Sequence, residues 1–145
     1  MQSDVPQSVA TRQGYHRCVR LADGRFHLFK PGPLAHLLYG GDFILASETF
    51  AELLRETCSH CLDFRRTEIV QIATGERFGI YFEIIPYDEI APESIGKVST
   101  VGFHAWRYGS SDLFVTQAVA DEIQKRGFDG ITFSPGFTHF AAAAG

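Results

Sequence analysis

Two segments of the chain, 69 positions apart, share one pattern, and this internal repetition constrains the fold more than any other feature. The first covers residues 42–66 and the second covers residues 112–135. Each has an apolar run behind an aspartate, then a hydroxyl residue (Ser47 or Thr116), a helix-like stretch and a closing apolar run that contains phenylalanine. This pattern predicts a supersecondary unit, strand–helix–strand, that occurs twice.

Each unit is expected to carry a short helix, because apolar residues follow the hydroxyl residue at helical spacing. In the first unit, Phe50, Leu53 and Leu54 would form one face of that helix. Ser47 suits the N-cap of this helix, and Gly127 suits a left-handed end of the second one. Strands and short helices in this order predict an α+β fold with a mixed or antiparallel sheet.

The clearest β-hairpin lies between the two units. Residues 62–72 and 77–85 have strand character on either side of a glycine-containing connection at 73–76. The two-residue period of a strand puts Tyr81 and Glu83 on the same face. We expect that face to be the more open one.

The remaining sequence suggests one domain with loose ends. Residues 1–13 show no periodicity and are expected to be a flexible leader. Residues 14–136 would form the domain, beginning with strand-like stretches at 15–21 and 25–29. Residues 137–145 end in a run of alanines and are expected to be a fraying tail.

Composition excludes several classes of function. The chain has 145 residues, 45% of them hydrophobic, which is enough for a real core. Its net charge of −4 argues against binding to nucleic acid, which needs a basic surface. No apolar run approaches the roughly 20 residues that span a bilayer, so no membrane association is expected. Three cysteines are an odd number, which favours free thiols and a cytoplasmic location.

Cys58, His60 and Cys61 are the compact group of metal-capable residues. A closed zinc site would need further ligands from Cys18, His27, His104 or His139. The matching loop of the second unit, residues 127–130, makes the same connection without any cysteine or histidine. A redox dithiol is also disfavoured, because Cys58 would lie at a helix C-terminus, where the dipole raises rather than lowers a thiol pKa. The sequence therefore predicts no metal and no cofactor. Cys58, His60 and Cys61 would be the candidate ligands if a metal were bound.

No complete catalytic motif is present. The chain lacks a nucleophile elbow, an HExxH pair and a phosphate-binding glycine loop. Asp42 and Asp112 could form a carboxylate pair, but their repetition favours a role in turns. The sequence therefore predicts a protein that is not an enzyme.

Aromatic and acidic residues in predicted edges and loops are the remaining candidates for function. Aromatic side chains are enriched in protein interfaces, and acidic groups attract basic partners. We predict a partner-binding surface that contains Trp106, Tyr108, Tyr87, Asp88 and Glu89.

The second unit resembles a known C-terminal motif. Residues 112–123 and 127–135, which read DLFVTQAVADEI and GFDGITFSP, are similar to the end of bacterial immunity proteins in polymorphic-toxin systems. The resemblance covers about residues 40–136. It implies a cytoplasmic, non-enzymatic protein that binds and neutralises a cognate toxin. Some relatives carry a double Cys-x-x-Cys-Gly motif, but here the single Cys-x-x-Cys is followed by Leu62, so a zinc ribbon is not implied.

Two other classes of function are alternatives to a toxin-binding protein. One is a small enzyme, either dependent on histidine and cysteine or binding a metal, which should gather Cys58, Cys61 and two histidines in a cleft. The other is a regulatory ligand-binding domain, which should contain a large apolar pocket.

Overall fold

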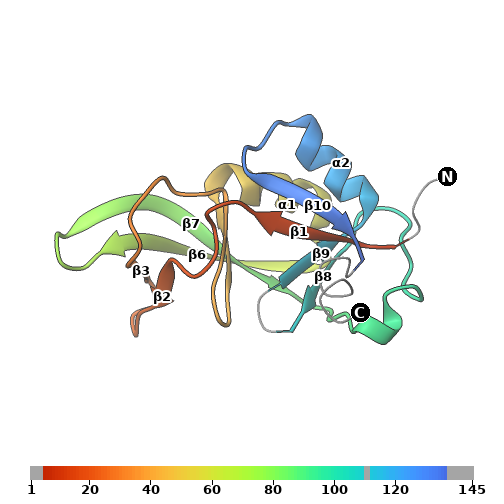
Figure 1. The fold of residues 1–145 in the computed structure, drawn as a ribbon, viewed down its shortest axis with the longest axis horizontal. Coiled ribbons are helices and arrows are strands. Elements are labelled where there is room, and N and C mark those ends of the chain that lie inside the picture. The colour runs from red at the N-terminus through yellow and green to blue at the C-terminus, as the bar shows by residue number, and fades with distance from the viewer. Residues whose placement is uncertain (1–4, 110–111, 137–145) are drawn as a thin grey trace.

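The computed structural model describes residues 5–109 and 112–136, which form ten strands, two α-helices and one 3₁₀ helix (Pro92–Ser94) (Figure 1). The predicted α+β class is confirmed, with most of the regular structure in sheets. The predicted tail, residues 137–145, lies outside the described residues. Neither helix in the described part of the chain is long and apolar enough to cross a membrane.

Four strands form the first sheet, in the order β10, β1, β9, β8, and all neighbouring pairs are antiparallel. They are β1 (Gln7–Thr11), β8 (Ala105–Tyr108), β9 (Asp112–Val115) and β10 (Ile131–Pro135). Gln7 lies opposite Pro135, and Thr11 lies opposite Ile131. The first and last strands of the described chain are therefore neighbours.

Strand β1 corrects the expectation of a flexible leader at residues 1–13. It occupies an inner position of this sheet, and Val9 is only 4% exposed. The hydroxyl of Ser8 also donates to the carbonyl of Ser134, at 3.1 Å. A strand of five residues with partners more than a hundred positions away leaves no local periodic signal, which is why the sequence did not reveal it.

Six strands form the second sheet, in the order β2, β3, β6, β7, β5, β4. They are β2 (Cys18–Arg20), β3 (Phe26–Leu28), β4 (Leu37–Tyr39), β5 (Ile44–Ser47), β6 (Leu62–Gln71) and β7 (Glu76–Pro86). Only the pairing of β3 with β6 is parallel among the pairs of this sheet. Figure 1 shows the far end of the β6–β7 hairpin projecting to the left.

The hairpin itself is confirmed. Its turn closes with the amide of Gly75 donating to the carbonyl of Gln71, at 2.8 Å. Gly75 has a φ of +76°, which favours glycine. The expectation for the faces of β7 was wrong, because Tyr81 and Glu83 are both only 6% exposed. The loop carbonyl of Ala35 accepts from the Tyr81 hydroxyl at 2.7 Å, and Arg20 covers Glu83.

The two similar segments adopt the same order of elements. Residues 42–66 contain β5, α1 (Glu48–Cys58) and the start of β6, and residues 112–135 contain β9, α2 (Gln117–Lys125) and β10. In each segment both strands run in the same direction, because both are antiparallel to one strand that lies between them. That middle strand is β7 in the first segment and β1 in the second.

The helix ends follow the sequence signals only in part. The hydroxyl of Ser47 accepts from the amide of Phe50 at 3.3 Å, so the predicted N-cap is confirmed. Gly127 has a φ of +73° and follows the last turn of α2. Thr116 differs, because its hydroxyl makes no cap and instead accepts from the amide of His104 at 3.2 Å.

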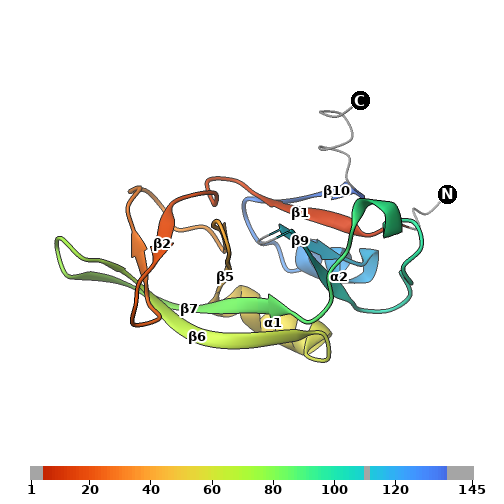
Figure 2. The same ribbon diagram turned by 90° about the horizontal axis from the view of Figure 1, so that it is seen from below.

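The largest buried cluster joins both helices to both sheets. It contains Phe50 and Leu54 of α1, Ile123 of α2 and Val9 of β1. The buried hydroxyl of Tyr39 donates to the carbonyl of Val9 at 2.8 Å and so links β4 of one sheet to β1 of the other. Figure 2 shows β1 and β10 on one side of the molecule and β6, β7 and α1 on the opposite side.

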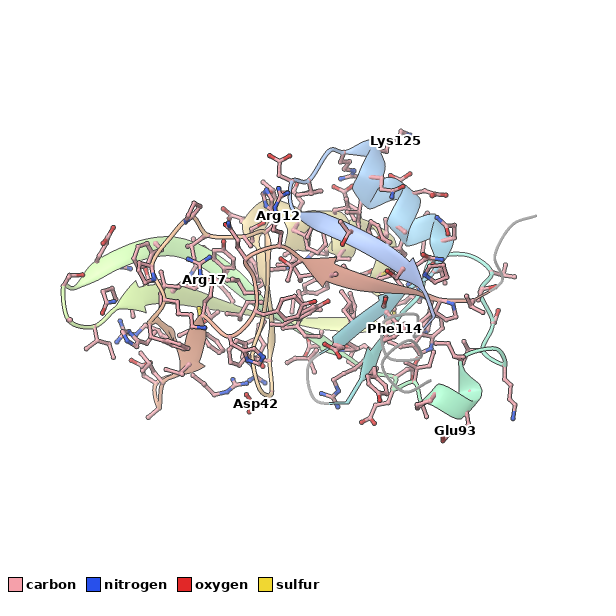
Figure 3. The ribbon with its side chains drawn as sticks, in the orientation of Figure 1. Arg12, Arg17, Asp42, Glu93, Phe114 and Lys125 are labelled. Atoms are coloured by element: carbon pink, nitrogen blue, oxygen red, sulfur yellow. The ribbon has the colours of Figure 1, made fainter. Side chains whose placement is uncertain are left out.

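Arg17 is a buried charge that organises the loops near β2. Its guanidinium donates to the carbonyl oxygens of Gln13 at 3.0 Å, Gly32 at 2.9 Å and Lys30 at 3.2 Å, and also to that of Pro33 (Figure 3). Only 5% of the residue is exposed. The planar fork of five donors suits such a set of carbonyls, which a lysine could not satisfy.

Candidate metal centre

The turn after α1 presents two cysteines and a histidine. Helix α1 ends at Cys58, and the chain turns so that the amide of Cys61 donates to the carbonyl of Cys58 at 3.0 Å. The Cys61 thiol points back to the same carbonyl, at 3.3 Å. Cys58 and Cys61 are buried, whereas His60 lies at the surface.

His104 reaches the same place from the other sheet. It lies immediately before β8 and continues the β8–β9 pairing, because the amide of Thr116 donates to its carbonyl at 3.0 Å. The Thr116 hydroxyl accepts from the amide of His104, so both backbone polar groups of His104 are held by one buried residue. Thr116, which follows β9, thus fixes the backbone position of His104.

His60, Cys61 and His104 converge. One ligand atom from each, a ring nitrogen or the sulfur, lies within 4.8 Å of the other two. Of the further ligands considered from the sequence, Cys18 and His27 belong to β2 and β3, outside this group, and His139 lies outside the described residues. The histidine that joins the cysteine turn is His104.

Both histidine rings are oriented by acceptors. Nε2 of His60 lies 2.8 Å from the carbonyl of Phe103, and Nε2 of His104 lies 2.9 Å from Oδ2 of Asp88. A carbonyl or carboxylate accepts only, so each Nε2 carries the proton and the Nδ1 of a neutral ring keeps a lone pair. The Trp106 ring packs on His104 at a centroid distance of 4.6 Å and restricts its rotation.

Residues 87–104 link β7 to β8, and we call them the connector. Asp88 is positioned by a short backbone bridge between this connector and β8. The amide of Arg107 donates to the carbonyl of Asp88 at 2.9 Å, and the amide of Ile90 donates to the carbonyl of Arg107 at 2.8 Å. Between these bonds the Arg107 side chain pairs with Glu89 at 3.1 Å. The residues after β7 therefore run alongside β8 and bring a carboxylate to His104.

The contact between the two cysteines moves their pKa values in opposite directions. The hydrogen bond with Cys58 is the main cause that lowers the pKa of Cys61, and the Ala105 backbone and the two histidines lower it further. The same hydrogen bond, followed by burial, raises the pKa of Cys58. Of the two thiols, Cys61 is therefore the one that loses its proton more readily.

This arrangement has two chemical uses. A cysteine beside a histidine that is held by a carboxylate resembles the set of a cysteine nucleophile. A substrate would have to reach Cys61, however, and that residue is 1% exposed. Thiolate sulfur and imidazole nitrogen are also zinc ligands, and a cation needs no such access for a bulky reactant. The burial therefore favours a metal over nucleophilic attack.

The predicted partner-binding residues fall into two groups. Tyr87 is 62% exposed, and the side chains of Asp88 and Glu89 are 56% and 68% exposed. Trp106 is a correction, because it is 5% exposed and packs with Ile90 and other apolar residues beneath the connector. Tyr108 is partly buried against the same cluster. The alternation of side chains along β8 could not show which of the two faces of this strand the connector covers.

The two repeated aspartates lie in different surroundings. Asp42 is at the exposed tip between β4 and β5, with a carboxylate oxygen 3.7 Å from Arg20 (Figure 3). Asp112 begins β9 and lines a hollow of about 410 Å³ together with Tyr15 and Tyr39, and burial raises the pKa of its carboxyl.

Comparison with known proteins gives no relative for this chain. No family model, curated protein or solved structure matches it.

Proposed function

We propose that this chain is a non-enzymatic binding protein whose partner is a bacterial toxin that it neutralises. The observation that carries the binding role is the set of large apolar side chains that the connector between β7 and β8 leaves in solvent. Val101 is 87% exposed, Tyr87 is 62% exposed and Phe103 is 41% exposed. Contiguous exposed apolar surface is a common mark of a protein interface.

The backbone brings these side chains to one region. The amide of Tyr87 donates to the carbonyl of Cys61 at 3.1 Å, and the carbonyl of Phe103 lies against the ring of His60. Tyr87 and Phe103, 16 positions apart in sequence, therefore flank the same turn after α1. Val101 is two residues from Phe103, and we call Tyr87, Val101 and Phe103 the connector patch.

Apolar side chains of the connector anchor it to β8 and β9. Ile90 is buried, and Ile95 and Val98 pack against Trp106 and Phe114. A segment anchored in this way presents the connector patch with little conformational entropy to lose on binding. Asp88 and Glu89 beside the patch supply a charge that attracts a basic partner surface.

The identity of the partner as a toxin rests on the resemblance of residues 40–136 to immunity proteins. The three free thiols support action in a reducing cytoplasm, where an intracellular toxin would be met. We also propose that the two strand–helix–strand segments are copies of one unit. The matching order of elements and the antiparallel strand inserted in each support this duplication.

Coexpression with the toxin-like product of the neighbouring gene tests the proposal. We expect a complex that copurifies and restores growth. The double variant Tyr87→Ser with Val101→Ser should weaken the complex at least tenfold, which corresponds to about 1.4 kcal/mol. Ile72→Ser is the matched control, because Ile72 is 59% exposed but lies at the far end of the β6–β7 hairpin. Failure to form a complex or to rescue growth would remove the proposed partner, and equal effects of both changes would remove the proposed surface.

A further inference from the structure

We propose that His60, Cys61 and His104 bind a zinc ion, which joins the turn after α1 to the start of β8. The three residues come from both sheets, since Cys61 precedes β6 and His104 precedes β8. The site is independent of the proposed toxin partner, because it rests on the side chains around these residues alone.

The donor atoms have the spacing of a site that closes with a small movement. All three lie within 4.8 Å of one another. A tetrahedral zinc ion with bonds of 2.0–2.3 Å holds its ligand atoms about 3.3–3.8 Å apart. His60 is exposed, whereas Cys61 is buried and the backbone of His104 is held by Thr116, so the adjustment would fall mainly to His60.

The surroundings of the ligands are those of a metal site. Histidine ligands usually donate their second ring N–H to a carbonyl or a carboxylate, which fixes the tautomer and the ring direction. His60 makes this bond to Phe103, and His104 makes it to Asp88.

The local charges suit a divalent cation. The thiolate of Cys61 would neutralise one positive charge, and the carboxylate of Asp88, through His104, would offset the other. Mixed nitrogen and sulfur ligands favour zinc over magnesium or calcium, which prefer oxygen.

Metal titration of the full chain tests the site directly. Protein stripped with a chelator under reducing conditions should bind one equivalent of zinc in calorimetry. Cobalt should produce the absorption of a tetrahedral site with a thiolate band. Zinc should raise the Tm, since it binds the folded state.

Four variants separate ligands from bystanders. His104→Gln and His60→Gln should each weaken zinc binding by about 100-fold or more, and Asp88→Asn by about 10- to 100-fold, because Asp88 positions a ligand. His27→Gln is the matched control for loss of a histidine elsewhere and should bind zinc like the unaltered protein. Circular dichroism of each variant verifies that it is folded.

Two results would overturn the site. One is the absence of stoichiometric zinc and cobalt binding by the reduced, folded protein. The other is zinc affinity that stays the same in folded His60→Gln and His104→Gln, which would place the metal elsewhere. The cobalt spectrum distinguishes these ligands further, since loss of Cys61 as a ligand removes the thiolate band.

Discussion

Arg20 on β2 holds Glu83 on β7 with both arms of its guanidinium. Nη1 lies 3.0 Å from one carboxylate oxygen and Nη2 lies 2.9 Å from the other. The Glu83 side chain is 8% exposed, whereas that of Arg20 is 34% exposed and stacks over Phe26 at 5.1 Å. If the pair is broken, the Arg20 side chain can therefore turn into solvent more easily than the Glu83 side chain can.

That asymmetry predicts unequal effects of removing each partner. Arg20→Met should lower the free energy of unfolding by about 3 kcal/mol, because it leaves a buried carboxylate with Arg65, at 3.8 Å, as its remaining ion-pair partner. Glu83→Gln should cost about 1–2 kcal/mol, since Arg20 can turn to solvent. Urea unfolding measures both, and a larger loss for Glu83→Gln would contradict the burial of this pair.

Val9 and Ala10 test the position of β1 in the first sheet. Val9 is 4% exposed and belongs to the largest cluster, whereas Ala10 faces the other way and is partly exposed. Val9→Asp should destabilise the fold by more than about 3 kcal/mol, because it buries a carboxylate. Ala10→Asp should change stability by less than about 1 kcal/mol. Equal effects in thermal unfolding would mean that β1 is the loose segment expected from the sequence.

Gly40 and Gly41 are neighbours, but only Gly41 has room for a side chain. A Cβ atom at Gly40 would collide with the ring of Phe43, while one at Gly41 would meet open space. Gly40→Ala should therefore lower the free energy of unfolding by about 2 kcal/mol through overpacking. Gly41→Ala should stay within about 0.5 kcal/mol of the parent in the same urea experiment. A tolerated Gly40→Ala would show that Phe43 moves away at little cost.

Tyr81 predicts a loss of stability in alkali. Burial raises its pKa from 10.0 to about 12, so the folded state keeps the phenol proton longer than the unfolded state. The resulting stabilisation is complete below pH 10 and is lost as the pH rises from 10 to 12. The loss attributable to Tyr81 should reach about 2–3 kcal/mol. Tyr81→Phe removes it, so the difference in unfolding free energy between the two proteins should shrink across that interval. A constant difference would refute the assignment.

Sequence periodicity sufficed where the determining contacts are local. The β6–β7 hairpin joins strands that are consecutive in the chain, the Ser47 cap bonds the amide of Phe50, and each strand–helix–strand segment is a continuous stretch of about 25 residues. It failed where partners are distant. Residues 7–11 form a strand only because β9 and β10 accept it, and Tyr81 and Glu83 are covered by loops and by β2.

At the candidate metal centre, too, the residues that are close in sequence could be predicted and the distant one could not. The Cys58–Cys61 pair is visible in one short stretch, but its histidine partner depends on how β8 meets the turn after α1. Residues 127–130 correspond to the turn alone and carry no information on a histidine from another part of the chain. His104 lies 43 positions after Cys61, and only the pairing with Thr116 and the bridge to Asp88 bring it there.

Strand β1 also sets the order in which this chain can fold during synthesis. Both of its paired strands belong to residues 112–135, so a ribosome must reach these residues, more than a hundred positions on, before β1 gains either neighbour. The six-stranded sheet needs nothing beyond residue 86 for its pairing and can form earlier. A nascent chain that pauses before residue 112 would therefore present a formed sheet beside an unpaired β1 segment, and unpaired strands of this kind are open to aggregation and to chaperones.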